Sequence, residues 1–265
     1  MPNNTRFIME VNKSEKGISM QTAKGKNTAG LKTKRKEAEK DISGQNHKGK
    51  NTAGLKAKRK EAEKILPMLE AKDLSFRYQQ HTPWILRNLS FSIGQGERVA
   101  LLGDSGCGKS TLSKILAGYL KPTKGEVLWK GQPLPEKGYC PVQWISQHPE
   151  QSVNPRWKMD KILRESWNPT DSFLSKLQIE KEWLKRWPIE LSGGELQRFS
   201  IARVLGPKTE FLICDEISTM LDVATQAQIW QVLLEESRRR GLGMLVVTHN
   251  LALAQRVADR IMELK

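Results

Sequence analysis

The sequence predicts an α/β fold that begins near residue 68, with a mostly parallel sheet and an antiparallel N-terminal layer. Residues 68–78 and 86–103 alternate apolar and polar side chains between turn residues, a pattern typical of antiparallel strands. "RVALLG" at 98–103 and "FLIC" at 211–214 are short apolar runs typical of buried strands in a parallel sheet. Beyond residue 103, apolar and aromatic residues recur at helical spacing, which predicts a helix; they are Leu112, Ile115, Leu116, Tyr119 and Leu120.

Length and composition bound the class of protein. The chain has 265 residues, of which 38% are apolar, enough for one sizeable core and a small second lobe. No apolar run approaches the ~18 residues that a membrane helix needs. The N-terminus also lacks the continuous apolar segment of a secretory signal. Cys107, Cys140 and Cys214 form no metal or disulfide pattern, which is typical of a cytosolic, reduced protein.

Most of the net charge of +15 lies in residues 1–66, which hold 17 Lys and Arg against 7 Asp and Glu. "KGKNTAGLK" at 24–32 returns at 48–56, and both copies continue to "KRKEAEK". Two copies without an apolar face cannot stack a core, so we predict a mostly disordered extension at 1–66 and a folded domain at 67–265. The basic charge would suit nucleic acid or anionic lipid. The alternative is a solvated extension or a misassigned start, with the domain beginning at Met68.

"GDSGCGKST" predicts a phosphate-binding loop between a strand and a helix, because it satisfies the pattern G-x-x-x-x-G-K-[ST]. Its glycines let backbone N–H groups turn towards an anion, and the helix start adds a positive dipole end. Lys109 can reach the β- and γ-phosphates, and the Ser110 hydroxyl can ligate Mg²⁺. A glycine-rich turn that happens to precede a helix is the alternative. The expected nucleotide-binding residues here are Gly103, Asp104, Ser105, Gly106, Cys107, Gly108, Lys109, Ser110 and Thr111.

Two acids follow the apolar run at 211–214, where the carboxyl end of a central strand would lie. Phosphate transfer to water needs acidic groups for the metal and for the attacking water. Asp215 can hold Mg²⁺ through water, and Glu216 can polarise the water that attacks the γ-phosphate. The alternative is that both acids merely end a strand.

"LSGGELQR" at 191–198 is a helix start in which Ser192 and Glu195 form an S-x-x-E capping box. Capping does not explain Gly193 and Gly194, which weaken the first helical turn. They suit a backbone that approaches a second anion closely. Here the sequence resembles the ATP-binding-cassette family, whose signature this is. The resemblance implies that the signature of one subunit covers the γ-phosphate held by the other.

The resemblance extends over nearly all of residues 68–265 and implies a P-loop NTPase catalytic lobe that binds ATP and Mg²⁺. It implies that Tyr78 stacks on adenine, that Gln147 joins the metal site and senses the membrane partner, and that His249 contacts the γ-phosphate. Asp222, in "STMLD", matches the acid of a loop that crosses the dimer interface. The expected catalytic residues are therefore Glu216, His249 and Gln147, and the expected metal-site residues are Ser110, Gln147 and Asp215.

Three features depart from the family pattern. His148 stands where Asp usually follows the glutamine, and Asn250 stands where Asp often follows the histidine. Neither is a primary catalytic position, so activity is expected to survive. The chain stops at "RIMELK", where the family normally continues through another strand. We expect this to weaken the domain or its partner contacts.

The resemblance also implies a small inserted helical lobe at about 148–190. Within it, "QSVNPRWKM" is similar to the peptide and nickel importer branch. The expected partners are a second ATPase subunit, two membrane permeases and an extracytoplasmic substrate-binding protein, and the expected place is peripheral, at the cytoplasmic face of the membrane. The tryptophans in or near the lobe either fill its core or line a groove for a permease helix. These are Trp144, Trp157, Trp167, Trp183 and Trp187.

Two other functions stay open at this stage. A soluble cassette ATPase acting on ribosomes or DNA would fit the basic N-terminus. Such relatives usually carry two cassettes or a long coiled-coil insertion, and this chain has neither, so nucleic acid is not the expected partner. A non-catalytic structural subunit is disfavoured by the intact Lys109, Asp215 and Glu216.

Overall fold

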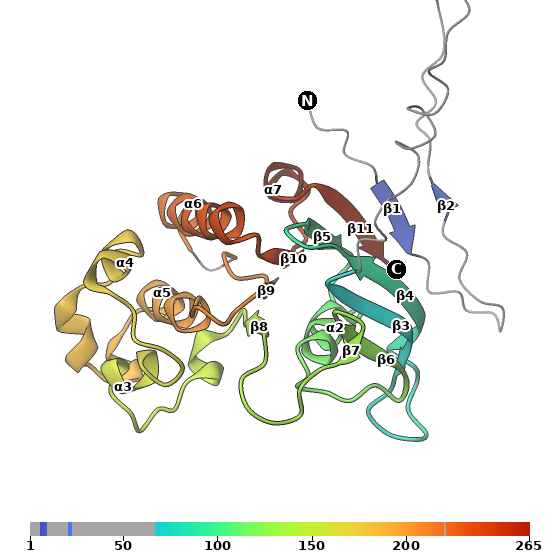
Figure 1. Cartoon of the computed structure of the whole chain (residues 1–265), viewed down its shortest axis with the longest axis horizontal. Helices are drawn as coiled ribbons and strands as arrows, with labels where there is room; N and C mark the ends of the chain where they lie inside the picture. Colours follow the sequence, from blue (N-terminus) through green and yellow to red (C-terminus); the bar gives the residue numbers. More distant parts are fainter. Residues whose placement is uncertain (1–5, 10–20, 23–66, 220) are drawn as a thin grey trace, which may run out of the picture. The chain divides into compact units, whose positions relative to one another are not determined.

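The structure is a computed structural model that describes residues 6–9, 21–22, 67–219 and 221–265, the first two ranges by their backbone (Figure 1). No helix in the described residues is long and apolar enough to cross a membrane. Most of the predicted extension at 1–66, including both copies of the repeat, lies outside the described residues. The boundary at residue 67 therefore stays a prediction.

A seven-stranded sheet has the order β2–β1–β11–β5–β10–β9–β8 (Figure 1). All neighbours in it pair in parallel except β1 and β2. The strands β9 and β10 are buried throughout, since helices and a second sheet cover their two faces. The strand bounds are β1 Arg6–Met9, β2 Gln21–Thr22, β5 Arg98–Leu102, β8 Val142–Ile145, β9 Phe211–Asp215, β10 Gly243–Val247 and β11 Arg260–Leu264.

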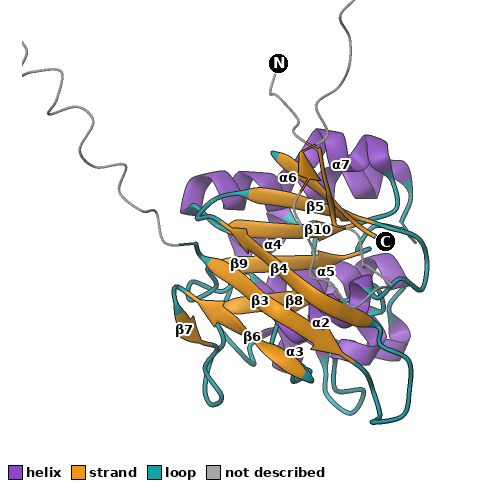
Figure 2. Cartoon of the chain, turned by 90° about the vertical axis from the view of Figure 1, so that its right-hand side faces the viewer, coloured by secondary structure: helices purple, strands orange, loops and turns teal. Residues whose placement is uncertain are grey.

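A four-stranded antiparallel sheet, in the order β4–β3–β6–β7, forms the N-terminal layer and lies across the parallel strands (Figure 2). Its apolar residues meet helix α2 (Lys109–Leu116) and the parallel sheet in one buried cluster. The predicted fold class, with a mostly parallel sheet and an antiparallel layer, is thereby confirmed. The strands are β3 Leu69–Phe76, β4 Leu86–Ile93, β6 Lys124–Trp129 and β7 Gln132–Pro133.

Helix α2 is shorter than the apolar spacing suggests. It ends at Leu116, because Gly118 takes a φ of +80° and turns the chain out of the helix. Tyr119 and Leu120 therefore lie beyond the helix, and the Tyr119 side chain is exposed. The apolar residues before the turn, Leu112, Ile115 and Leu116, are buried as the spacing predicts.

The segment between β8 and β9 is helical. Its helices pack on α6 (Val223–Arg240) and the far face of the sheet in a second buried cluster, and they gather away from the antiparallel sheet (Figure 1). The helical lobe expected at about 148–190 stays a prediction. The helices are α3 Met159–Leu163, α4 Asp171–Lys176, α5 Gly193–Val204 and the 3₁₀ helices Pro149–Ser152, Lys181–Lys185 and Pro188–Glu190. A last helix, α7 Leu251–Val257, precedes β11.

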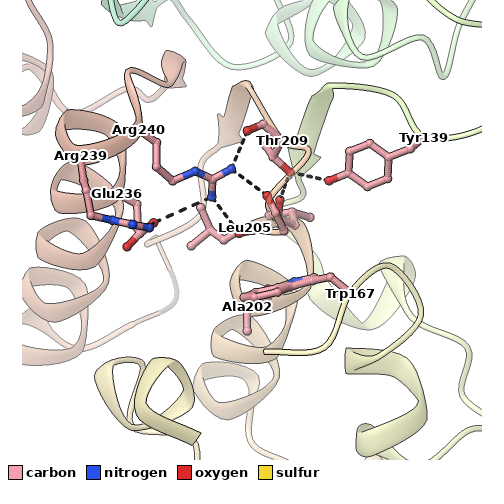
Figure 3. A network of polar contacts seen from close by, with 10 residues as sticks. Tyr139, Trp167, Ala202, Leu205, Thr209, Glu236, Arg239 and Arg240 are labelled. Atoms are coloured by element: carbon pink, nitrogen blue, oxygen red, sulfur yellow. Dashed lines mark hydrogen bonds and ion pairs between the residues drawn. The ribbon is translucent and has the colours of Figure 1, made fainter. Parts of the chain in front are cut away.

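A polar network joins the C-terminal ends of α5 and α6 (Figure 3). The guanidinium of Arg240 donates hydrogen bonds to the carbonyls of Leu205 at 2.9 Å, Gly206 at 2.8 Å and Thr209 at 2.6 Å. The Thr209 hydroxyl in turn contacts the hydroxyl of Tyr139, which comes from the loop before β8. Arg240 thus donates to three backbone carbonyls of the turn that follows α5, and one of them, that of Gly206, also accepts a hydrogen bond of 3.0 Å from the Thr209 N–H.

Two short segments of the extension that the sequence predicts to be mostly disordered pair with the sheet. Residues 6–9 run parallel to residues 261–264, and residues 7–8 also pair with 21–22. The physical reason is that β11 would be the edge of the sheet without β1, and backbone N–H and C=O groups along a sheet edge can pair with an added strand. Backbone pairing of this kind needs no apolar periodicity in the added segment, so composition and pattern did not indicate it.

Candidate functional site

The loop before α2 takes a backbone shape that only glycine permits at several positions. Gly106 and Gly108 have φ values of +82° and +102°. A Cβ on Gly103 would lie 2.5 Å from the Leu264 carbonyl oxygen, and one on Gly108 would lie 2.9 Å from the Ile85 side chain. The loop therefore packs so closely on β11 and on Ile85 that side chains at Gly103 and Gly108 are excluded.

Lys109 folds back over this loop. Its ammonium group donates hydrogen bonds to the carbonyl oxygens of Gly103 and Asp104, each at 2.8 Å, and the residue is only 6% exposed. A buried cation held by two neutral carbonyls is incompletely neutralised. The arrangement therefore favours an anion beside the loop, which the lysine can reach by turning away from either carbonyl.

A cavity of about 700 Å³ opens next to the loop. It is large enough for a nucleotide-sized ligand. Five parts of the chain line it: residues 84–87, the loop with the start of α2, Gln147 after β8, Glu216 after β9, and Lys265. The lining residues are Trp84, Ile85, Arg87, Ser105, Gly106, Cys107, Gly108, Lys109, Ser110, Thr111, Gln147, Glu216 and Lys265.

Ser110 and Asp215 meet at the floor of this region. The Ser110 hydroxyl donates a hydrogen bond of 3.3 Å to the Asp215 carboxyl, although the two residues are 105 positions apart. Burial raises the pKa of Asp215, while the bond from Ser110 opposes that rise. A hydroxyl and a carboxylate are hard oxygen ligands of the kind that Mg²⁺ takes together with substrate phosphates, so these residues fit that ion.

The described residues hold no cluster of three or more His, Cys, Asp or Glu side chains that could bind a metal. The hydroxyl of Ser110 and the carboxyl of Asp215 are enough for Mg²⁺ when phosphates and water supply its remaining ligands, since Mg²⁺ rarely occupies an all-protein cage.

Glu216 stands in a strained backbone conformation, with a φ of +49°. Its side chain is mostly buried and lines the cavity, and its carboxyl lies 3.5 Å from Nδ1 of His249. Gln147 reaches Thr219, three residues after Glu216, with a hydrogen bond of 3.5 Å. The ends of three adjacent strands thus bring Gln147, Glu216 and His249 into one neighbourhood, as the sequence predicts for a site at the carboxyl edge.

Tyr78 lies at the outer end of the loop. Its hydroxyl is 3.4 Å from the Thr111 hydroxyl, and its ring packs edge-on against Phe76 with 5.0 Å between centroids. The ring is 60% exposed, so its face is free to stack on a flat ligand group.

The sequence reasoning missed the apolar cavity residue Ile85 and three further cavity residues: Trp84, Arg87 and Lys265. They are far from the recognisable motifs, and only their type, one aromatic ring and two cations, suits an aromatic anion such as a nucleotide. Lys265 also lines a neighbouring hollow of about 420 Å³ together with Asp104 and His249.

The residues of the predicted signature lie elsewhere. Ser192 caps α5 in the expected box: the Glu195 N–H donates to the Ser192 hydroxyl at 3.3 Å, and the Ser192 N–H donates to the Glu195 carboxyl at 2.6 Å. A Cβ on Gly193 would meet no atom within 4 Å, whereas one on Gly194 would touch Leu221. Within the described chain, Ser192, Gly193 and Gly194 do not line the cavity around Lys109.

Asp222 also lies outside that cavity and serves as the N-cap of α6. Its carboxyl accepts a hydrogen bond of 2.9 Å from the Thr225 N–H. Hydrogen bonds from Thr225 lower the pKa of Asp222. The contact between Gly194 and Leu221 places this turn beside the start of α5.

A hollow of about 640 Å³ on the helical segment joins two of the tryptophans. The Lys161 ammonium lies 4.0 Å from the centre of the Trp157 ring, and Lys158 lies 5.9 Å from that of Trp187. Trp167 instead donates its indole N–H to the Ala202 carbonyl at 2.9 Å, and Trp183 packs against the core. Trp183 and Trp167 are thus held against the core, Trp187 lines the hollow, and Trp157 does both, while a permease groove stays a prediction.

Comparison with known proteins agrees with this arrangement. The family model described as ABC transporter matches residues 86–219. The chain is 35% identical over 211 residues to the nickel import system ATP-binding protein NikE of Staphylococcus aureus, strain bovine RF122 / ET3-1. That match covers 75% of this chain and 87% of the relative.

Two solved structures resemble the chain. The dimeric, post-hydrolysis structure of the ATP-binding cassette MJ0796, bound to ADP and Pi, has a TM-score of 0.63 at 26% identity and covers 75% of this chain and 94% of that one. The cbiO1 structure from Clostridium perfringens, described as part of the ABC transporter complex cbiONQ, has a TM-score of 0.61 at 23% identity. It covers 75% of this chain and 85% of that chain, and shows a shared fold.

Proposed function

Because the chain belongs to the ABC transporter family and is a transporter ATPase of that family, we propose that it energises the import of nickel, a metal chelate or a short peptide. The observation that carries the catalytic part is the cavity that brings Lys109, Gln147 and Glu216 together. The relative at 35% identity is a nickel import system ATP-binding protein, which favours nickel, whereas a peptide substrate rests on the sequence resemblance alone.

The chain's own groups divide the work of binding ATP. The backbone N–H groups of residues 105–109 and the start of α2 surround the phosphates, and the Lys109 ammonium exchanges its carbonyl partners for the β- and γ-phosphates. Tyr78 stacks on the adenine, and Arg87 adds positive charge to the cavity wall. Mg²⁺, held by Ser110 and by Asp215 through water, would neutralise charge between the β- and γ-phosphates.

Hydrolysis then depends on the strand ends. Glu216 accepts a proton from the attacking water, since its carboxyl lines the cavity and has no stronger partner there than His249 at 3.5 Å. His249 contacts the γ-phosphate, and Gln147 links the site to the helical lobe through its position after β8. The strained backbone at Glu216 supports this role, because strain of this kind collects at functional positions.

The catalytic test is Glu216→Gln, which keeps the shape of the side chain and removes its basicity. We expect ATP binding to persist and turnover to fall by at least about 100-fold. The matched control is Glu210→Gln: Glu210 directly precedes the same strand, at its opposite end, and pairs with Lys130 on the surface. Wild-type turnover by Glu216→Gln, or an equal loss in the control, would contradict the assignment.

A second ATPase subunit is the nearest proposed partner. Ser192, Gly193, Gly194 and Asp222 lie apart from the chain's own cavity, and Gly193 faces open space, which suits contact with a nucleotide held by another subunit. The similar cassette MJ0796 was solved as a dimer. We propose that two such subunits enclose two MgATP molecules, each completed by the partner's signature.

The remaining proposed partners are two permeases and an extracytoplasmic binding protein, which would hold this subunit at the cytoplasmic face of the membrane. The hollow around Trp157 and Trp187 suits a permease segment with apolar and acidic side chains, because lysines surround both rings. Affinity purification from the native cell tests this class of function. Recovery of permeases supports transport, whereas recovery of ribosomes or DNA favours the soluble alternative.

A further inference from the structure

Trp144 carries a polar atom that the proposed reaction does not yet use. Its indole nitrogen is buried and has no hydrogen-bond acceptor within the described residues. Buried N–H groups are nearly always paired, so an orphan close to a reaction centre calls for an explanation. Trp144 lies in β8, three residues before Gln147.

The pairing of β8 with β9 places this indole beside Asp215. Trp144 lies opposite Ile213 in the parallel ladder, and Asp215 follows Ile213 by two residues. Side chains two residues apart on a strand point to the same face of the sheet. Trp144, Ile213 and Asp215 therefore share one face of the sheet, with Asp215 two residues beyond the cross-strand neighbour of Trp144.

Other contacts hold the indole in this orientation. The Tyr119 ring packs against it with 5.4 Å between centroids, and the Lys114 ammonium lies 5.6 Å from its centre. Both residues belong to α2 or the turn directly after it, the same helix that begins with Lys109 and Ser110. The indole is thus fixed between the phosphate-loop helix and the strand that ends at Asp215.

Without the Trp144 indole, the orientation of the Asp215 carboxyl group is not fully fixed. Among the described residues, the side-chain hydrogen bond that its carboxyl accepts comes from Ser110 and is long, at 3.3 Å. A single bond fixes one oxygen but leaves the carboxyl group free to rotate about its axis. A second donor on the same face fixes the plane of the group.

Resting on the proposed ATPase function, we propose that Trp144 is a positioning residue whose indole N–H donates to the Asp215 carboxyl and holds it ready for the metal that accompanies ATP. The residue touches neither the nucleotide nor the metal in this role; it acts through Asp215. Its effect is therefore confined to the part of ATP affinity that depends on the divalent cation.

The test compares ATP binding by calorimetry in excess Mg²⁺ and in excess EDTA. The dissociation constant in EDTA divided by that in Mg²⁺ isolates the contribution of the metal to ATP affinity. We expect Trp144→Phe, which keeps an aromatic ring but removes the donor, to reduce this ratio by about three- to ten-fold while affinity in EDTA stays unchanged. Trp144→His, which keeps a ring N–H, should lie between Trp144→Phe and wild type.

Trp129→Phe is the matched control, because Trp129 packs on Phe211 at the opposite end of the same strand β9, with 6.4 Å between ring centroids. It should keep the wild-type ratio. An unchanged ratio in Trp144→Phe, or an equal reduction in Trp129→Phe, would overturn the inference. A wild-type chain that does not bind ATP would instead contradict the proposed function itself.

A second measurement keeps the inference testable if the Trp144 variants do not fold. It uses the chain with Trp84→Phe, which removes the one tryptophan among the cavity's lining residues. We expect one indole N–H nuclear resonance to move downfield when Mg²⁺ is added to the ATP complex, as its hydrogen bond to a charged acceptor shortens. If no indole resonance moves, the proposed contact is wrong.

Discussion

Replacement of Arg240 by methionine tests whether the network at the ends of α5 and α6 stabilises the fold. Methionine preserves much of the volume of the stem but removes three hydrogen bonds to the carbonyls of Leu205, Gly206 and Thr209. The Arg240 side chain is only 15% exposed, so water can reach these carbonyls poorly after the change. The Gly206 carbonyl keeps the Thr209 N–H as a donor, whereas the carbonyls of Leu205 and Thr209 lose the donor that Arg240 supplies, which is the costly way to lose a hydrogen bond.

The expected size follows from these contacts. Hydrogen bonds to a charged group contribute about 1.5–3 kcal/mol each, but burial of the guanidinium itself opposes them and lowers the pKa of Arg240. We therefore expect a net loss of about 2–4 kcal/mol in the free energy of unfolding, well below the sum of the three bonds. For a folded part of this size, that corresponds to a fall of roughly 4–16 °C in Tm.

The assay is thermal and urea unfolding followed by circular dichroism, with Arg239→Met as the control. Arg239 also pairs with Glu236, but its side chain is 67% exposed and makes no bond to a backbone carbonyl. Its replacement should leave Tm unchanged within error. If Arg240→Met melts with the wild type, or if both variants fall equally, the carbonyl contacts do not stabilise the fold as argued.

Four further predictions concern the nucleotide site and the chain's two ends. Lys109→Ala should weaken MgATP binding by about ten-fold or more in calorimetry, whereas Lys121→Ala on the exposed surface should not weaken it. Equal MgATP affinities of the two variants would show that Lys109 does not reach the phosphates. Cys107 lines the cavity, so ATP should slow its alkylation. Cys214 is buried, which raises its pKa far above the ordinary value, so it should resist alkylation with or without ATP. Mass spectrometry of the labelled peptides measures both rates. Specific ATPase activity should rise with protein concentration, and Ser192→Arg should abolish the rise but not ATP binding; activity that is flat down to the monomer would contradict a shared site. A chain that begins at Met68 should keep ATP binding and turnover, and their loss would show that the preceding residues are needed.

The sequence could predict the fold where physical patterns are local. The apolar run at 211–214 becomes β9, buried throughout, and the alternation at 69–76 and 86–93 becomes two paired antiparallel strands. It could not predict where α2 ends, because Tyr119 continues the apolar spacing while Gly118 overrides it with a positive φ. Nor did it indicate β1, since pairing at a sheet edge uses backbone groups that every residue carries.

The candidate site divides in the same way. The sequence predicts the phosphate loop and the acids after β9, because their chemistry needs particular residues at particular spacings. In the structure, Lys109 and Glu216 line one cavity. Arg87 and Lys265 line that cavity from ordinary surface-type sequence, so no pattern distinguishes them from solvated lysines and arginines. Long-range packing places them, and packing is absent from a single sequence.

The backbone at Glu216 has an evolutionary consequence. Its φ of +49° suits asparagine better than glutamate, so Glu216→Asn would relieve local strain and raise the melting temperature slightly. The same exchange removes the carboxyl group. With Glu216 as the proposed base, selection for heat resistance alone would therefore favour an inactive protein at this position, and only selection for turnover would retain the acid. Laboratory evolution of this chain for stability needs an activity screen at every round, because the substitution that relieves strain at Glu216 also removes the carboxyl group proposed for hydrolysis.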